Sequence, residues 1–172
     1  EIARFLAEHE NISIGISLDG DGNVNDKKRK FQDGTGAFSG TIKAIKLLNK
    51  VGRDNISLSC TVDNHNINEL ESLLRLNDEY EFVAINMNIL LDTEKDMVNH
   101  EYMEKVSKKI LNYFELAREK GLYEDRIMRK LKAFISNKIH PFDCQATGNQ
   151  IVCSPDGKFG VCHEGIGAKR SY

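Results

Sequence analysis

Three segments of this 172-residue chain alternate apolar and polar residues, and no other feature of the sequence constrains the fold as strongly. Every second residue is apolar in residues 11–19, 56–63 and 81–91. A period of two predicts β-strands. Apolar residues then recur at helical spacing in residues 38–52, 67–74 and 101–120. Strands that alternate with helices predict βαβ units, and therefore a parallel sheet with right-handed crossovers.

The sequence also marks where some of these helices begin and end. Gly52 and Gly121 follow the first and third helices, and glycine commonly ends a helix by adopting a positive φ. Asn66 and Glu69 resemble a capping pair at the start of the second helix. Cys60 falls on the apolar side of its strand, where we expect a buried small hydrophobe.

The polar side of the three strands is unusual for a parallel sheet. Strands covered on both faces normally read as continuous apolar runs, whereas Ser, Gly, Thr, Asp and Asn occupy one side of each strand here. One explanation is an antiparallel sheet with one face in water, which the intervening helices make awkward. We favour a partial (β/α) barrel, whose apolar side packs on outer helices while its polar side lines a wet cavity for a polar ligand.

The predicted fold class is therefore α/β, with parallel strands followed by a helical connector and a C-terminal β-hairpin. The part of a barrel would occupy residues 1–122 and the connector residues 123–143. A weakly periodic, basic stretch within the connector predicts a short helix that ends before Pro141. The remaining segment, residues 144–172, holds the hairpin.

Charge and hydropathy exclude several classes of partner. The chain has 24 Lys and Arg against 26 Asp and Glu, a net charge of −2, which gives no electrostatic case for nucleic acid or an anionic membrane. No apolar run approaches the roughly 20 residues that span a bilayer, and residues 1–10 are too charged for a signal peptide. We therefore expect a soluble cytoplasmic protein.

The C-terminal segment holds three of the four cysteines, and its pattern is typical of a β-hairpin. Pro155 suits the first central position of a turn, and Gly157 suits a positive φ. If Cys153 faces Lys158 across this turn, Cys162 lies further along the ladder, at the open end of the hairpin.

Cys144, just before the hairpin, can reach the same open end, so Cys144 and Cys162 are the candidate pair of metal ligands. Zinc and iron–sulfur centres ordinarily take four protein ligands, so the others would lie beyond Tyr172. Spacing alone leaves three alternatives open: a structural zinc site that recruits His163, an iron–sulfur cluster, and two ordinary thiols.

Several motifs in order resemble the second half of a radical S-adenosylmethionine barrel. They are Ser17-Leu-Asp-Gly20, Asn25-Asp26-x-x-Arg29, Gly34-Thr-Gly-Ala-Phe38 and Thr61-Val62 with Asn66. Cys144-x12-Gly157-x4-Cys162 is similar to the start of the SPASM extension, which binds auxiliary iron–sulfur clusters in that family. The resemblance covers nearly the whole chain, and it is closest to anaerobic sulfatase-maturating enzymes and peptide maturases.

The resemblance implies roles for four residues of the predicted barrel. Ser17 and Asp19 would bind the cofactor at the C-terminal mouth of a strand, and Arg29 matches the arginine that holds the carboxylate of S-adenosylmethionine. Without the resemblance, Arg29 is a solvated member of a basic run, and Ser17 and Asp19 are turn residues. Asn86 is either a contact of the cofactor or substrate, or an amide satisfied within the barrel.

Two departures from the family pattern bear on activity. The Cys-x3-Cys-x2-Cys motif of the catalytic cluster and the Gly-rich cofactor segment do not occur in this sequence. Both would lie upstream of Glu1, so we expect a fragment that is inactive by itself. His163 stands where sulfatase-maturating enzymes carry an aspartate base. An imidazole also accepts a proton, so His163 is the candidate catalytic residue. Alternatively, His163 is simply exposed beyond the hairpin. The histidine in place of the aspartate favours peptide maturation over sulfatase maturation.

By this resemblance, the full-length protein is a radical S-adenosylmethionine oxidoreductase or maturase. A [4Fe–4S] cluster would convert S-adenosylmethionine to a 5′-deoxyadenosyl radical, which removes a hydrogen atom from a peptide or protein side chain. An auxiliary cluster would begin with Cys144 and Cys162, and a flavodoxin or ferredoxin would supply electrons. The alternative is a non-catalytic α/β peptide-binding module whose hairpin is held by structural zinc.

Overall fold

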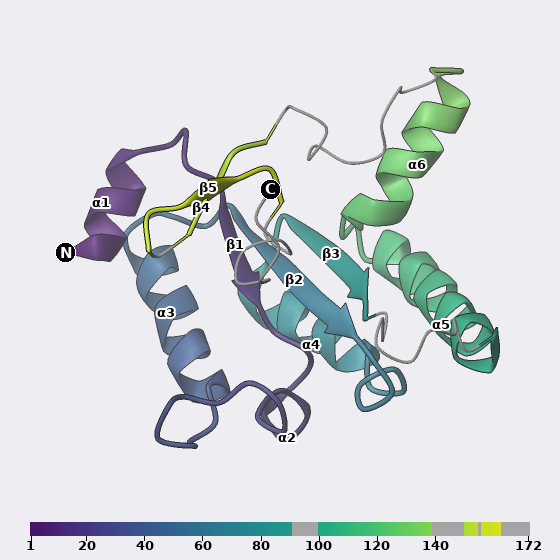
Figure 1. Cartoon of the computed structure of the whole chain (residues 1–172), viewed down its shortest axis with the longest axis horizontal. Coiled ribbons are helices and arrows are strands. Elements are labelled where there is room, and N and C mark those ends of the chain that lie inside the picture. The colour runs from purple at the N-terminus through teal and green to yellow at the C-terminus, as the bar shows by residue number, and fades with distance from the viewer. Residues whose placement is uncertain (91–99, 139–149, 155, 163–172) are drawn as a thin grey trace. The chain divides into compact units, whose positions relative to one another are not determined.

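The structure, a computed structural model, describes residues 1–90, 100–138, 150–154 and 156–162. The chain forms two compact units, Glu1–Lys130 and Leu131–Tyr172. Figure 1 shows the order of the helices and strands along both units. The boundary between them falls inside the last helix, and the domain limits after residues 122 and 143 stay predictions.

The first unit is built on a parallel sheet in the order β1-β2-β3. The strands are β1 (Ile14–Ser17), β2 (Ile56–Val62) and β3 (Ala84–Ile89). All pairing among them is parallel, with Ile14 opposite Ile56 and Leu58 opposite Ile85. The prediction of βαβ units is confirmed, and the antiparallel alternative is wrong for this sheet.

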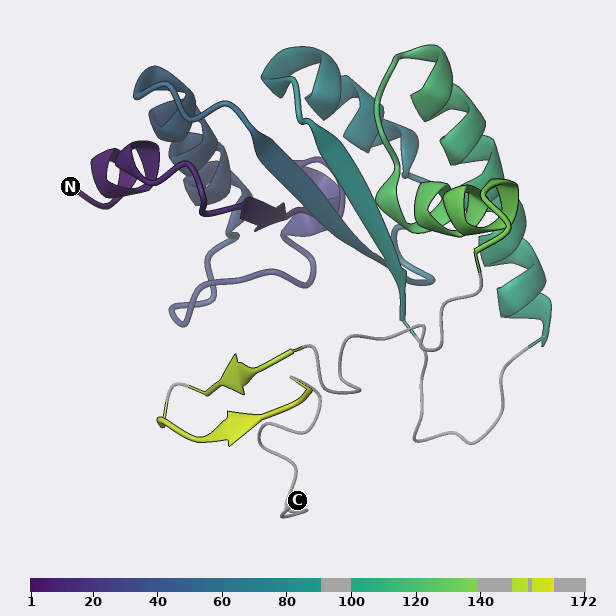
Figure 2. The ribbon, with the colours of Figure 1, turned by 90° about the horizontal axis from the view of Figure 1, so that it is seen from above.

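Helices cover the apolar face of the sheet. Figure 2 shows α3 (Phe38–Lys50), α4 (Glu71–Tyr80) and α5 (His100–Glu119) on one side of the strands. The strand residues that pack beneath them are buried: Ile56, Leu58, Cys60, Val62, Ile85 and Met87. The prediction for Cys60 is therefore confirmed. Burying these apolar side chains is the main stabilisation of the sheet.

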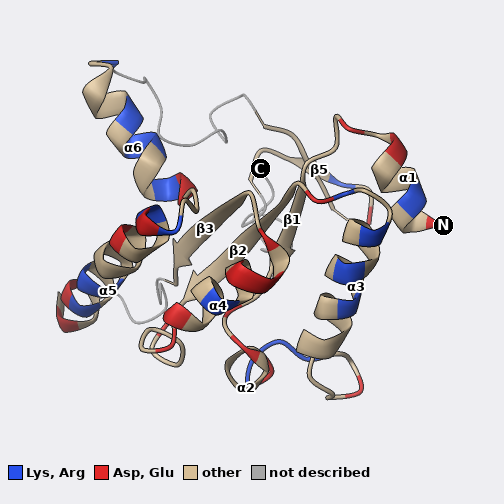
Figure 3. Cartoon of the chain, turned by 180° about the vertical axis from the view of Figure 1, so that it is seen from behind, with Lys and Arg blue, Asp and Glu red and all other residues tan. Residues whose placement is uncertain are grey.

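Charged residues lie on the outer sides of these helices. Figure 3 shows Lys and Arg along α3 and both signs of charge along α5. The unit also contains two short helices, α1 (Ile2–Glu8) and α2 (Gly22–Asn25). In the part of the chain that the structure describes, no helix is both long and apolar enough to cross a bilayer.

The other face of the sheet is polar, as predicted. Gly15 and Ser17 are exposed, and the polar positions of β2 and β3 are half-buried: Ser57, Ser59, Thr61, Asn86 and Asn88. Three strands do not close a barrel, so within this unit these positions form an open face rather than the lining of an enclosed cavity.

The ends of the helices follow the sequence signals in two cases and depart from them in one. Gly52 and Gly121 have φ values of +79° and +74° just after α3 and α5, as expected. The expected capping pair is wrong, because α4 begins at Glu71 with no side-chain cap. Asn66 instead accepts a hydrogen bond at Oδ1 from the backbone N–H of Asp63, at 2.8 Å, in the turn after β2.

The chain returns to the sheet after α5 and adds a short bridge beside β3. Glu124 pairs in parallel with Ile85, and the N–H of Ile85 donates to the Tyr123 carbonyl at 2.8 Å. The predicted short helix follows directly as α6 (Asp125–Ile135). The bridge occupies the position at which a fourth parallel strand of a barrel would continue the sheet.

The second unit contains the predicted hairpin, formed by β4 (Val152–Cys153) and β5 (Phe159–Gly160). Gly157 has the expected positive φ, +79°. The predicted register is wrong by one residue, because Cys153 lies opposite Phe159 rather than Lys158. Backbone N–H of Ser154 donates to the Lys158 carbonyl at 2.8 Å, so these two residues close the turn.

Candidate functional site

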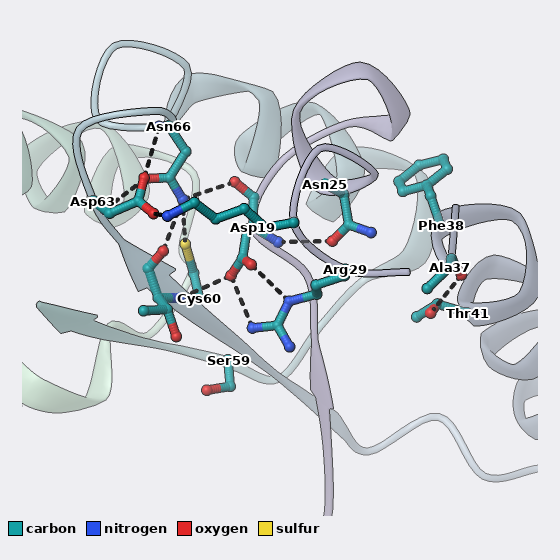
Figure 4. A network of polar contacts seen from close by, with 12 residues as sticks. Asp19, Asn25, Arg29, Ala37, Phe38, Thr41, Ser59, Cys60, Asp63 and Asn66 are labelled. Atoms are coloured by element: carbon teal, nitrogen blue, oxygen red, sulfur yellow. Dashed lines mark hydrogen bonds and ion pairs between the residues drawn. The ribbon is translucent and has the colours of Figure 1, made fainter. Parts of the chain in front are cut away.

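Two carboxylates stand just beyond the C-terminal ends of neighbouring strands. Asp19 lies two residues after β1, and Asp63 follows β2 directly. Because the strands are parallel, both side chains reach the same edge of the sheet, and the loop after α2 brings two cations to them (Figure 4). Arg29 pairs with Asp19, and Lys28 pairs with Asp63. Parallel sheets commonly bind ligands at this edge.

The contact between Asp19 and Arg29 is a two-point ion pair. Arg29 Nε donates to Asp19 Oδ2 at 2.6 Å, and Nη2 donates to Oδ1 at 3.0 Å. The Asp19 side chain is 13% exposed and that of Arg29 is 33% exposed. The interpretation of Arg29 as a merely solvated cation is therefore wrong. The planar guanidinium is held in one orientation, with Nη1 directed away from Asp19.

The side chain of Asp19 also contacts the neighbouring strand β2, and its backbone N–H and carbonyl groups contact two asparagines. Its Oδ1 accepts from the backbone N–H of Thr61 at 2.9 Å. The backbone N–H of Asp19 donates to Asn25 Oδ1 at 3.1 Å, and its carbonyl accepts from Asn66 Nδ2 at 3.0 Å. Both asparagines are buried. A carboxylate fixed in this way keeps Arg29 preorganised for a ligand.

The loop that carries Arg29 is closed around Asp26. Asp26 Oδ1 accepts from the backbone N–H of Phe38 at 2.8 Å, at the start of α3. Gly36 lies so close that a Cβ atom on it would be 2.0 Å from Asp26 Oδ2. The backbone N–H of Ala37 donates to the Arg29 carbonyl at 3.0 Å. A residue larger than glycine at position 36 would therefore clash with Asp26.

Asp63 is a second fixed anion at this edge. Its Oδ2 accepts from Lys28 Nζ, and its Oδ1 accepts from the backbone N–H of His65 at 2.7 Å. Burial raises the pKa of the Asp63 carboxyl, but the hydrogen bonds from Lys28 and His65 outweigh it, so this pKa lies below its usual range. Asp63 is therefore an ionised anchor rather than a proton donor.

Cys60 lies beneath these two carboxylates. Its Sγ is 3.7 Å from Asn66 Nδ2. Burial raises the pKa of the Cys60 thiol, and the negative charge of Asp19 raises it further. A thiol that stays protonated is a poor nucleophile and a poor metal ligand, which agrees with a packing role.

A row of polar side chains crosses the open face next to this edge. Ser17 lies opposite Ser59, and Ser59 lies opposite Asn86 in the parallel register. Oδ1 of Asn86 is buried and has no hydrogen-bond partner among the described residues. The described residues therefore do not satisfy this oxygen, and both interpretations of Asn86 stay predictions. Unpaired buried acceptors are uncommon in folded proteins, so Asn86 is open to a ligand that donates a hydrogen bond.

The structure brings together part of the predicted site. Asp19 and Arg29 are in contact, and Ser17 and Asn86 lie on the same polar face. Cys162 follows β5 in the second unit, and Cys144 and His163 lie outside the described residues. Within the described ranges, no three His, Cys, Asp or Glu side chains gather as a metal site. The metal and catalytic assignments therefore stay predictions.

Sequence reasoning missed the second ion pair. Asp63 ends its alternating segment as Asp19 ends the first, and this repeated position was a usable signal. No comparable signal marks Lys28, because spacing does not distinguish it from its neighbours in the basic run. Asn66 was expected at the start of a helix. Its hydrogen bond to the Asp19 carbonyl joins residues 47 positions apart, and sequence spacing does not reveal such a contact.

Comparison with known proteins supports a relationship in sequence and in fold. No family model matches the chain. An 81-residue stretch is 33% identical to the mycofactocin maturase MftC of Mycobacterium ulcerans (strain Agy99), covering 46% of this chain and 21% of that protein. The chain therefore matches only about a fifth of the length of this curated relative.

Solved structures share the fold. A structure of anSMEcpe with bound AdoMet superposes with a TM-score of 0.66 at 19% identity, over 79% of this chain and 39% of that one. SuiB of Streptococcus suis, bound to S-adenosylmethionine, superposes with a TM-score of 0.60 at 14% identity, over 98% of this chain and 40% of that one. The predicted resemblance to radical S-adenosylmethionine enzymes of the SPASM type is confirmed, and so is the fold class.

Proposed function

We propose that the protein containing this chain is a radical S-adenosylmethionine enzyme that modifies a peptide or protein side chain. The observation that carries the proposal is the Asp19–Arg29 fork at the C-terminal edge of a parallel sheet. The similarity in sequence to a maturase, and in fold to proteins with bound S-adenosylmethionine, supports it. Because the chain covers less than half of the matched structures, the proposal concerns the whole protein.

The described side chains fit S-adenosylmethionine. Its carboxylate needs a fixed cation, and Arg29 offers the N–H groups that Asp19 does not use. Its hydroxyl and amino groups need acceptors, and Asn86 Oδ1 is a buried acceptor that no described residue pairs with. Gly15 leaves open space on the polar face, since a Cβ atom there would meet nothing within 4 Å.

In this proposal, Arg29 binds the carboxylate and Asp19 acts by holding Arg29. Ser17 and Asn86 offer a hydroxyl and an amide to the rest of the cofactor. When bound next to a reduced [4Fe–4S] cluster, S-adenosylmethionine supplies a radical that removes a hydrogen atom from the substrate. The task of this chain is to orient the cofactor and to present the peptide beside it.

We also propose that Cys162 and Cys144 bind an auxiliary iron–sulfur cluster, that His163 accepts a proton, and that a flavodoxin or ferredoxin supplies electrons. Cys162 is half-buried and follows β5, whereas Cys153 is exposed and ends β4 next to the turn. This difference makes Cys153 a matched control for Cys162.

Replacing Arg29 with Gln in the full-length protein tests the main proposal. We expect S-adenosylmethionine to bind about 5- to 150-fold more weakly, the range for losing about 1–3 kcal/mol of charge-assisted contact. Calorimetric titration of the anaerobically reconstituted protein measures this change. The control is Lys27→Gln, which removes an exposed charge of the same loop. Equal affinity in the wild-type protein and Arg29→Gln would reject the assignment.

Replacing Cys162 with Ser tests the auxiliary cluster. After anaerobic reconstitution, we expect less iron and labile sulfide per chain than in the wild type, because a thiolate ligand is lost. Cys153→Ser should keep the wild-type content. One zinc per chain and no iron in the wild-type protein would instead support the peptide-binding module with a zinc-held hairpin.

A further inference from the structure

Arg126, the second residue of α6, is a cation that forms no ion pair with another described residue. Its Nη2 donates to Asn88 Oδ1 at 2.6 Å, and Asn88 lies on the polar face of β3. Its Nε is buried and has no hydrogen-bond partner among the described residues, which also offer it no carboxylate as an ion-pair partner. Arg129, on the next turn of α6, differs in pairing with Asp125 at 2.9 Å. The guanidinium of Arg126 is thus held in place with binding capacity to spare.

The neighbouring carboxylate of Glu124 is committed to backbone groups. Its Oε2 accepts from the N–H of Ile127 at 2.7 Å, and its Oε1 accepts from the N–H groups of Arg126 and Met87 at 3.3 and 3.4 Å. Glu124 is fully buried and closes the N-terminus of α6. Its oxygens therefore hold the main chain rather than the Arg126 side chain.

Arg126 is linked to the row of polar side chains on the open face. Asn88 Nδ2 is 3.5 Å from Ser59 Oγ, and Ser59 lies opposite Asn86, whose Oδ1 has no partner within the described part of the chain. The unused donor of Arg126 is therefore connected through Asn88 and Ser59 to the strand position opposite Asn86, which carries the unused acceptor. Unpaired buried polar groups are costly, so a ligand that pairs with them would be stabilised on this face.

We propose that Arg126, held by Asn88, is a second binding subsite on this face and takes a carboxylate of the peptide substrate. The proposal rests on the proposed function for the identity of the occupant. Arg29 and Arg126 follow the two outer strands of the sheet. Arg29 comes after β1, and Arg126 comes after the bridge beside β3. The cofactor carboxylate and the substrate carboxylate would thus have separate guanidinium groups.

Small blocked amino acids test the subsite in the full-length protein. N-acetyl-aspartate amide carries an acidic side chain, N-acetyl-glycine carries a chain-terminal carboxylate, and N-acetyl-asparagine amide is a neutral match for the first. Binding is followed by NMR, through the Nε–H signal of Arg126. We expect one carboxylate probe to bind at least about tenfold more tightly than the neutral probe, because a guanidinium fork favours a carboxylate. The carboxylate probe that binds more tightly shows whether the subsite takes an acidic side chain or the C-terminal carboxylate of a peptide.

Variants then assign the site. Arg126→Gln should abolish the preference for the carboxylate, Arg126→Lys should retain part of it, and the control Arg129→Gln should retain all of it. Circular dichroism verifies that each variant is folded. A preference that survives Arg126→Gln, or equal binding of the charged and neutral probes by the wild type, would overturn the proposal.

S-adenosylmethionine titrations separate this proposal from the proposed function. If Arg126→Gln weakens the binding of S-adenosylmethionine as much as Arg29→Gln is expected to do, Arg126 belongs to the cofactor site. The subsite assignment is then wrong. If the wild-type protein binds a carboxylate probe through Arg126 but does not bind S-adenosylmethionine, the subsite stands and the proposed function fails.

Discussion

Replacing Asp19 with Ala is expected to lower the free energy of unfolding by about 2–4 kcal/mol. The change removes both acceptors of the Arg29 fork and leaves the backbone N–H of Thr61 without its partner. A partly buried guanidinium then loses its counter-ion. The expected loss is below the full cost of a buried charge, because the Arg29 side chain is 33% exposed. Urea denaturation measures it.

The same variant separates a positioning role from direct binding. If Asp19 acts through Arg29, Asp19→Ala and Arg29→Gln will weaken S-adenosylmethionine binding by amounts that do not add in the double variant. Asp54→Ala is the control, because Asp54 is exposed and makes no side-chain hydrogen bond or ion pair among the described residues. Full additivity between the two positions would contradict the positioning role.

Replacing Gly36 with Ala is expected to destabilise the protein by about 2–3 kcal/mol, a typical cost of overpacking. The new Cβ would lie 2.0 Å from Asp26 Oδ2 and 2.2 Å from Cγ, so the carboxyl must move. Asp26 would then lose the backbone N–H of Phe38, and the loop that carries Arg29 would lose its closure. We expect weaker binding of S-adenosylmethionine together with the lower stability.

Gly15→Ala provides the matched comparison for Gly36→Ala. Gly15 is exposed in β1, and an added Cβ atom meets no atom within 4 Å. We expect its stability to stay within about 1 kcal/mol of the wild type, since the only remaining effect is on the unfolded chain. Thermal unfolding of both variants checks the pair. Equal destabilisation would mean that the loss at Gly36 is not steric.

Most of the first unit was predictable because burial there is one-sided. In β2, the alternation of residues directly matches the alternation of buried and half-buried positions. The α3 and α5 helices also follow their apolar spacing, and each is followed two residues later by a glycine with positive φ. The start of α4 was not predictable, because Asn66 serves a long-range contact with Asp19 instead of capping the helix.

The candidate site was predictable where residue type and position coincided. Asp19 and Arg29 were identified by a family pattern, but their mutual ion pair depends on how the intervening loop folds. Whether Asn86 Oδ1 and Arg126 Nε find partners depends on three-dimensional neighbours, which spacing does not encode, and neither atom has one in the described ranges. The hairpin register was missed by one residue because Ser154 and Lys158 close a turn that is one residue shorter than the assumed turn between Cys153 and Lys158.

The parallel register of Ser17, Ser59 and Asn86 has a consequence for how this scaffold can change its chemistry. Main-chain hydrogen bonds set the interval between neighbours in that row at about 4.8 Å, whatever side chains the positions carry. Substitutions there would alter which functional groups are displayed while their separation is preserved. Evolution could thus retune ligand preference one position at a time without rebuilding the framework.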